Sequence, residues 1–140
     1  MKRICLLALL AVVACGQAIP INRVQEACKN DNPRVGQTAI LSTKFHGVSG
    51  TAKIVDNCTI EISQFSYDGG GLDVRVYGSK DGNFKTGVNL SPQDIHGKSY
   101  ANQTLTLKLP ADPVVSLDEV KFISIYCVSV NESFGDGEFK

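Results

Sequence analysis

Residues 104–109 read Thr-Leu-Thr-Leu-Lys-Leu and alternate between polar and apolar side chains. Successive side chains of a β-strand point to opposite faces of the sheet, so this pattern predicts a strand with one buried face. The stretch Leu72–Tyr77 repeats the pattern, with Val74 and Val76 on the same parity as Leu72. Two such runs in one chain favour an all-β fold.

Further strands are predicted on both sides of these runs. The candidates are Thr38–Phe45, Thr51–Val55, Thr59–Phe65, Phe122–Val130 and a short last strand at Phe139. The run at 122–130 is apolar on both parities, which predicts a central strand buried on both faces. Turn residues such as Asp56-Asn57 separate the strands. We therefore expect a single all-β domain of about eight short strands, folded as an antiparallel sandwich or a barrel-like sheet.

Composition excludes two classes of protein. The chain has 140 residues, with 14 Lys+Arg and 14 Asp+Glu, so its formal net charge is zero. A protein that binds nucleic acid through a basic surface needs an excess of Lys and Arg, and we therefore expect no nucleic-acid partner. Hydrophobic residues make up 43% and charged residues 20% of the chain, a mixture that predicts a folded core rather than disorder.

The first 18 residues have the layout of a secretory signal peptide. Lys2 and Arg3 precede an apolar run over residues 4–14, and the small residues that follow fit cleavage after Gly16 or Ala18. The run is too short to span a bilayer, and no later stretch approaches the length that would. The alternatives are a lipoprotein signal, in which Cys15 carries the lipid, and a retained anchor.

A signal peptide at residues 1–18 divides the chain into three expected parts. We expect residues 1–18 to be removed, residues 19–36 to form a lead-in segment with one helical turn near Val24–Lys29, and residues 37–140 to form the domain. The protein is expected to be secreted and extracellular.

Cysteine and asparagine patterns agree with secretion. Removal of the signal leaves three cysteines, Cys28, Cys58 and Cys127. Three is an odd number, and one disulfide with one free thiol is the simplest arrangement. Three sequons for N-glycosylation are also present, at Asn57-Cys58-Thr59, Asn102-Gln103-Thr104 and Asn131-Glu132-Ser133, and a fourth, Asn89-Leu90-Ser91, is weakened by Pro92 directly after it.

Several fragments, taken in chain order, carry a resemblance to a known family. They are His46-Gly47-Val48-Ser49-Gly50-Thr51, Thr59-Ile60-Glu61-Ile62, Phe65-Ser66-Tyr67-Asp68-Gly69, Leu105–Pro110 and Val120–Cys127. This pattern resembles the DM-thirteen domain, a small extracellular domain found beside DOMON domains in Skeletor-like proteins. The resemblance covers Gly36 to Phe139.

The resemblance implies a part in extracellular electron transfer, with extracellular proteins or glycoproteins as partners. Its redox group would be one cysteine in the penultimate strand, and by position that cysteine is Cys127. The chain departs from the family at Tyr126, where Trp is frequent, and at Leu72, where Pro is usual. Since Cys28 and Cys58 fall outside the family's pattern, we expect them to form a disulfide and Cys127 to remain free.

Two functions from different classes stay open. The first is a secreted redox module that works through Cys127, either as a thiol or with bound haem. The candidate axial ligands for haem are Cys127, His46 and His96, although no Cys-x-x-Cys-His attachment motif is present. The second is an extracellular binding or adhesion domain without catalysis, in which Cys127 only fills the core.

A glycine-rich segment is the remaining candidate site. Its notable residues are Tyr67, Asp68, Gly69, Gly71 and Asp73. We expect a tight turn in which Asp68 accepts hydrogen bonds from nearby backbone amides. A Ca²⁺ site formed by the two carboxylates is the alternative, but the spacing is not that of an EF-hand, and we expect no metal.

Sequence signatures of enzymes are missing. The chain has no nucleophile elbow and no His-Glu-x-x-His pair for hydrolysis, and no Cys-x-x-Cys for zinc. We therefore expect at most an electron-transfer component rather than an enzyme with a substrate of its own.

Overall fold

The computed structural model describes residues 28–140, and the expected signal peptide and most of the expected helical turn at 24–29 lie outside these residues. The described part contains nine β-strands and two short 3₁₀ helices. The strands are β1 (Thr38–Ile40), β2 (Ser42–Thr43), β3 (Ser49–Asp56), β4 (Thr59–Tyr67), β5 (Val74–Ser79), β6 (Val88–Asn89), β7 (Tyr100–Lys108), β8 (Phe122–Cys127) and β9 (Glu132–Glu138), and the helices are η1 (Phe84–Thr86) and η2 (Leu117–Glu119).

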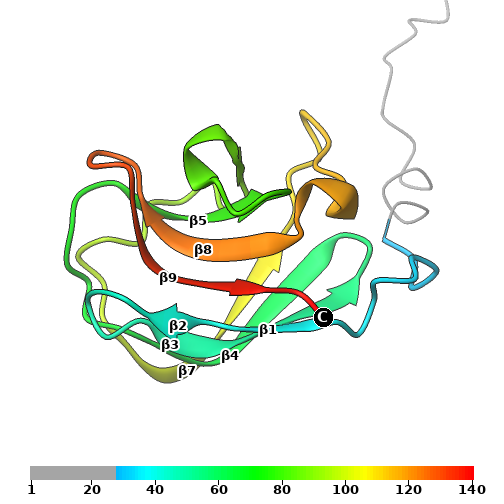
Figure 1. Ribbon diagram of the computed structural model, residues 1–140. Coiled ribbons are helices and arrows are strands. Elements are labelled where there is room, and N and C mark those ends of the chain that lie inside the picture. The colour runs from blue at the N-terminus through cyan, green and yellow to red at the C-terminus, as the bar shows by residue number, and fades with distance from the viewer. Residues whose placement is uncertain (1–27) are drawn as a thin grey trace, which may run out of the picture.

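The strands form two antiparallel sheets that pack face to face (Figure 1). The first sheet has the order β1-β3-β4-β7 and the second the order β2-β9-β8-β5-β6. The predicted all-β antiparallel fold is therefore confirmed, as a sandwich rather than a closed barrel. The core lies between the sheets and includes Ile54, Ile62, Val76 and Ile125, whose side chains are fully buried.

The first predicted strand, Thr38–Phe45, is two strands. The chain leaves the first sheet after β1 and joins the second sheet as β2, with the buried Leu41 between them. The Leu41 N–H bonds to the Gly50 carbonyl at 3.0 Å, which holds the crossing point against β3. Residues 38–43 therefore tie together one side of the sandwich, and the strand count rises above the expected eight.

The predicted run Phe122–Val130 ends early. Strand β8 stops at Cys127, residues 128–131 form a turn, and β9 returns antiparallel to β8. Val130 is 66% exposed because it sits in that turn, so its apolar character misled the strand prediction. The last strand is β9, and Phe139, expected in it, follows directly after it as a buried residue.

Burial of β8 on both faces is confirmed. Ile123 and Ile125 face the core, while Tyr126 lies on the outer face and is still only 4% exposed. The segment that follows β5 covers it there through Phe84, whose ring lies 6.1 Å from the Tyr126 ring, and the Tyr77 ring of β5 lies beside it at 5.1 Å. This extra layer appears above β5 and β8 in Figure 1.

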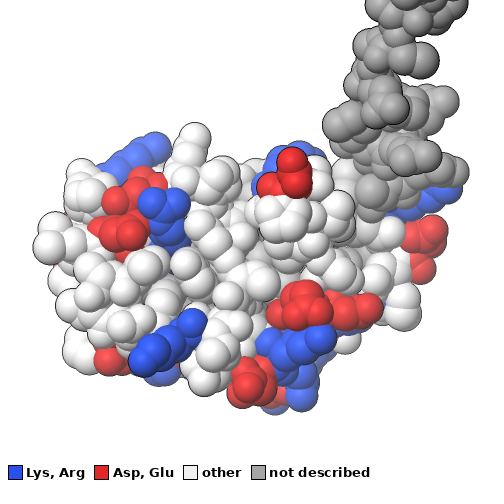
Figure 2. Space-filling view, turned by 90° about the horizontal axis from the view of Figure 1, so that it is seen from above, with Lys and Arg blue, Asp and Glu red and all other residues white. Residues whose placement is uncertain are grey.

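Charges on the face of the second sheet lie mainly around its border. Figure 2 shows this face with an uncharged centre and with Lys and Arg beside Asp and Glu near the rim. Pairs such as Lys80–Glu119, at 2.7 Å, explain the mixing of the two signs. Among residues 28–140, none of the helices has the length and apolar character needed to cross a membrane.

Candidate functional site

The glycine-rich segment 68–73 connects the two sheets at one end of the sandwich. It leaves β4 of the first sheet after Tyr67 and enters β5 of the second at Val74. Two close contacts explain its composition. A Cβ atom on Gly70 would lie 2.2 Å from the His46 ring, and one on Gly71, whose φ is +93°, would lie 2.8 Å from the Phe134 ring. Only glycine fits both the conformation and the space at Gly71.

Asp68 bonds to the segment in the way the sequence predicts. Its carboxylate accepts a hydrogen bond from the Gly70 N–H at 2.7 Å and lies 3.0 Å from Nδ1 of His46. These two partners, the Gly70 amide first, hold the pKa of Asp68 below its ordinary value. The His46 ring also packs on the Phe134 ring of β9 at 4.4 Å, so His46 links the glycine-rich segment to β9.

This carboxylate gives a pH prediction. Because the pKa of Asp68 is lowered by folding, its contribution to stability is present above the unfolded value near pH 4 and disappears as the pH falls through the folded value. We expect Asp68→Asn to be less stable than the parent chain at pH 5, in urea unfolding, and the difference to vanish toward pH 2. Asp81 and Asp94, whose pKa values are also lowered, are the same in both chains and cancel.

A difference that stays constant from pH 5 to pH 2 would contradict this assignment. In the same measurement, added Ca²⁺ should leave the urea midpoint of both chains unchanged. Asp73, the other carboxylate of the Ca²⁺ alternative, is bound to Nε of Arg75 at 2.6 Å. Within the described residues, no group of three or more His, Cys, Asp and Glu side chains could hold a metal ion.

Cys127 lies under this segment as the last residue of β8. Its side chain is unpaired and 1% exposed. The Sγ atom donates a hydrogen bond to the Leu72 carbonyl at 3.0 Å and contacts the Ser129 hydroxyl at 3.3 Å. Ser129 in turn donates to the same carbonyl at 2.5 Å. The Leu72 side chain is 67% exposed, so the sulfur lies one layer of residues below the surface.

These contacts define what the thiol can do. A carbonyl oxygen can only accept, so the Cys127 thiol is the donor in its bond to Leu72. The Ser129 hydroxyl is the neighbouring group that could turn and donate to the sulfur once its proton has left. Ser129 was not predicted, and its position two residues after Cys127 was the only sequence signal that pointed to it.

Tyr67 joins the glycine-rich segment to an aromatic cluster of the first sheet. Its hydroxyl donates to the Gly70 carbonyl, in the same segment whose Leu72 carbonyl binds Cys127. Burial, followed by the charges of Asp68 and Cys127, raises the pKa of Tyr67 above its ordinary value. The Tyr67 ring lies 6.5 Å from Phe65 and 6.4 Å from Tyr100. The predicted turn residues and Cys127 therefore meet at one end of the sandwich.

The geometry does not fit haem at Cys127. An axial ligand must present its atom to an open space wide enough for a porphyrin, and the Cys127 side chain is almost fully covered. The two histidines lie in different loops, and each binds an aspartate through Nδ1, His46 to Asp68 and His96 to Asp94. None of the three candidate axial ligands is therefore placed to bind haem iron in this fold.

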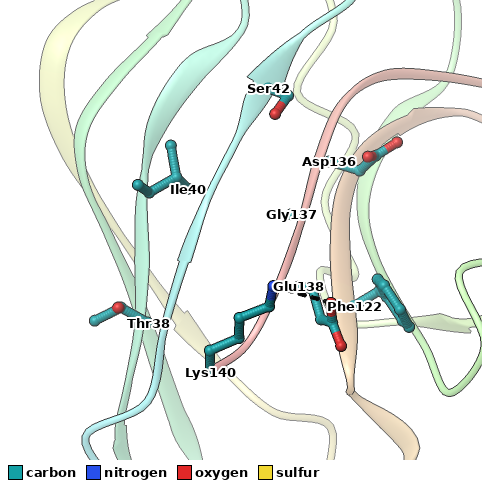
Figure 3. Close-up of a pocket in the computed structure, with 8 residues that line it drawn as sticks. All are labelled: Thr38, Ile40, Ser42, Phe122, Asp136, Gly137, Glu138 and Lys140. Atoms are coloured by element: carbon teal, nitrogen blue, oxygen red, sulfur yellow. Dashed lines mark ion pairs between the residues drawn. The ribbon is translucent and has the colours of Figure 1, made fainter.

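A surface groove lies away from these residues. It has a volume of about 480 Å³ and runs between the β1–β2 segment and β9 (Figure 3). Lys140 forms an ion pair with Glu138 there, at 3.5 Å. Its other lining residues are Thr38, Ile40, Ser42, Phe122, Asp136 and Gly137. None of the predicted site residues lines it.

The predicted disulfide is present between Cys28 and Cys58, with a Cα–Cα distance of 4.8 Å. Cys58 lies in the tight turn between β3 and β4, so the bridge fixes the start of the described chain to that hairpin. The three sequon asparagines lie far apart: Asn57 in the same turn, Asn102 on β7 and Asn131 in the turn before β9.

Sequence comparisons with known proteins identify a family to which this chain is similar. The profile of a family described as "Electron transfer DM13" matches residues 40–139. Two curated relatives from Drosophila melanogaster, Protein Skeletor isoforms B/C and isoforms D/E, are each 30% identical over 102 residues, which is 69% of this chain.

The chain spans a small share of those relatives, 13% of the B/C form and 7% of the D/E form. No solved structure matches. The family profile nevertheless covers every strand from β2 to β9 and includes both the glycine-rich segment and Cys127. The chain therefore belongs to the DM13 family, whose description is electron transfer.

Proposed function

We propose that this protein is a secreted extracellular redox module in which Cys127 transfers the electron. The observation that carries the proposal is the position of the thiol. It is unpaired, lies just below the surface, and touches the exposed Ser129, whose hydroxyl provides a route for a proton. The family description supports a redox role, and the disulfide supports an extracellular location.

The proposed step is a one-electron oxidation of the thiol. The sulfur gives one electron to an extracellular partner protein or glycoprotein that carries a ferric or cupric centre, and this centre is reduced by one electron. The thiol proton leaves through Ser129 to water, and Cys127 becomes a thiyl radical. The return of one electron and one proton restores the thiol. The protein is a carrier in this scheme and has no substrate of its own.

Spin-trapping electron paramagnetic resonance tests the step. After oxidation by a photogenerated ruthenium(III) tris-bipyridine complex, we expect a trapped thiyl signal from the native chain and none from Cys127→Ser. Serine can donate to the Leu72 carbonyl as cysteine does, so this variant should keep the native melting temperature within a few degrees. Ser129→Ala should give the same radical more slowly, because the proton route is removed.

The alternative is a binding or adhesion domain in which Cys127 is structural. One observation favours it: the sulfur is buried and its proton already has an acceptor in the Leu72 carbonyl, as in an ordinary core residue. Identical spectra from the native chain and Cys127→Ser would support this alternative and remove the redox proposal.

Secretion is part of the proposal. Cleavage of the signal after Gly16 or Ala18 would leave a chain that starts at Gln17 or Ile19. The intact mass of the secreted chain gives its first residue directly, and the same measurement serves the experiment described below.

A further inference from the structure

Strand β7 has a free edge. It is nine residues long, stands at the end of the first sheet, and pairs with β4 alone among the described strands. The other edge strands expose fewer unpaired backbone groups. Strands β2 and β6 have two residues each, and β1 is bonded to Lys140 through two backbone hydrogen bonds. An unpaired strand edge exposes N–H and C=O groups that can pair with another chain.

The usual protection of such an edge is weak in β7. Residues 100–107 contain no charged residue and no proline, and the side chains of residues 101–104 are exposed. Charged side chains, especially lysine, and prolines are what natural edge strands use to prevent pairing. The single lysine of the strand, Lys108, lies at its end and bonds to Thr59. Protection of β7 must therefore come from another source.

A glycosylation sequon lies on this edge. Asn102-Gln103-Thr104 is within β7, and all three side chains are exposed. Asn102 has a positive φ of 52°, at an irregular part of the pairing with β4, and its backbone N–H bonds to the Ser66 hydroxyl at 3.0 Å. Its side-chain amide has no bonding partner among the described residues.

The other sequons have side chains that are already bonded or buried in the folded chain. The Asn57 Nδ2 atom donates to Asp31 at 2.6 Å, and its neighbour Cys58 is in the disulfide. For Asn131, the side-chain oxygen accepts from the Tyr126 hydroxyl, and the sequon's Ser133 is buried and bonded to Asp136 at 2.7 Å. In the weaker sequon at Asn89, the side-chain oxygen accepts from the Ser91 N–H at 3.0 Å, and Ser91 is buried. Among the four sequons, the one at Asn102 alone has all three side chains exposed.

We propose that Asn102 carries an N-linked glycan that covers the free edge of β7 and prevents pairing with a second copy of this chain. The inference rests on the proposed secretion, because the donor is a lipid-pyrophosphate oligosaccharide of the secretory pathway. The Asn102 Nδ2 atom bonds to C1 of the first sugar, the bond from C1 to the pyrophosphate oxygen breaks, and the lipid pyrophosphate leaves with the proton lost by the amide. Even one sugar residue beside the strand blocks the spacing of about 4.8 Å that an added strand requires.

Mass spectrometry of the full chain secreted from cultured animal cells tests the site. We expect a glycan on the native chain that a glycosidase specific for N-linked sugars removes, and a loss of that mass in Asn102→Gln and in Thr104→Ala. The matched control, Asn131→Gln, should retain it. A secreted chain whose glycan survives both substitutions in the Asn102 sequon overturns the proposal. A chain that keeps residues 1–14 and has no glycan overturns proposed secretion as well.

Sedimentation tests the effect on the edge. Thr104→Ala keeps Asn102 in its left-handed conformation, and we expect this variant to form dimers as its concentration rises while the glycosylated chain stays monomeric. Adding Thr106→Lys, which places a charge on the same edge opposite Glu61, should restore the monomer. A Thr104→Ala chain that stays monomeric overturns the protective role. Cys127→Ser should change neither result, so failure of the redox proposal remains distinguishable.

Discussion

Replacement of both Cys28 and Cys58 by serine should lower the free energy of unfolding by about 3–4 kcal/mol, the chain-entropy value for a loop of this length. The two cysteines are separated by 30 residues in the sequence, and the bridge restricts the unfolded chain over that distance. Urea unfolding of the parent chain and the double variant measures the difference. Replacing both cysteines avoids a new pairing between a single remaining one and Cys127.

Removal of the disulfide should destabilise some parts of the chain more than others. Without the bridge, the start of the described chain keeps polar contacts such as the Asn57 N–H bond to the Lys29 carbonyl at 2.9 Å. Hydrogen exchange should therefore become faster first in residues 29–37. Amides of β8 should still exchange only when the whole domain unfolds. Cys127→Ser, which leaves the bridge intact, is the matched control. A double variant as stable as the parent chain would show that the bridge adds nothing to this fold.

The second large effect is expected at Gly71. Gly71→Ala should cost about 1–3 kcal/mol for a side chain in an unfavourable backbone region and about 1–3 kcal/mol more for overpacking against Phe134. The new Cβ would lie 2.8 Å from that ring and 3.0 Å from Val74. Because Leu72 follows directly and its carbonyl binds the Cys127 thiol, the variant should also uncover the sulfur.

Gly36→Ala is the control that separates the backbone cost from the overpacking cost. Gly36 has nearly the same φ, +94°, but nothing lies within 4 Å of the position of its Cβ. It should therefore show the backbone cost alone. A thiol reagent supplies the second readout: a loss of about 2–6 kcal/mol, taken up by local opening of that segment, raises the open population in Gly71→Ala by roughly 30- to 20,000-fold. Equal reactivity of Cys127 in both variants would show that the glycine-rich segment does not guard the thiol.

Local patterns in the sequence were enough to predict much of this fold. The alternation at Leu105, Leu107 and Leu109 predicted an inward face, and Leu107 and Leu109 are buried. The bond between Asp68 and the Gly70 amide was predicted because it joins neighbouring residues. The pairing of Cys28 with Cys58 followed from the family resemblance, which set Cys127 apart.

Contacts between distant residues could not be predicted in this way. His46 is 22 residues from Asp68, and nothing in its own glycine-rich surroundings indicated that it would pack on Phe134 and hold the segment over Cys127. The split of residues 38–43 between two sheets was missed for the same reason. Its cause is the crossing at Leu41, and a run of strand-forming residues has the same composition whether it continues in one sheet or changes to another.

The backbone bonds between Thr38 and Lys140, at 3.1 and 3.0 Å, have an architectural consequence. They place the beginning and the end of the sandwich side by side, next to β1 (Figure 1). Polypeptide attached at these two positions would therefore leave the domain from the same end of the sandwich. The opposite end, where Cys127 lies, would stay accessible. A unit with adjacent attachment points can be inserted into a surface loop of a host protein, or strung in series, without refolding either part.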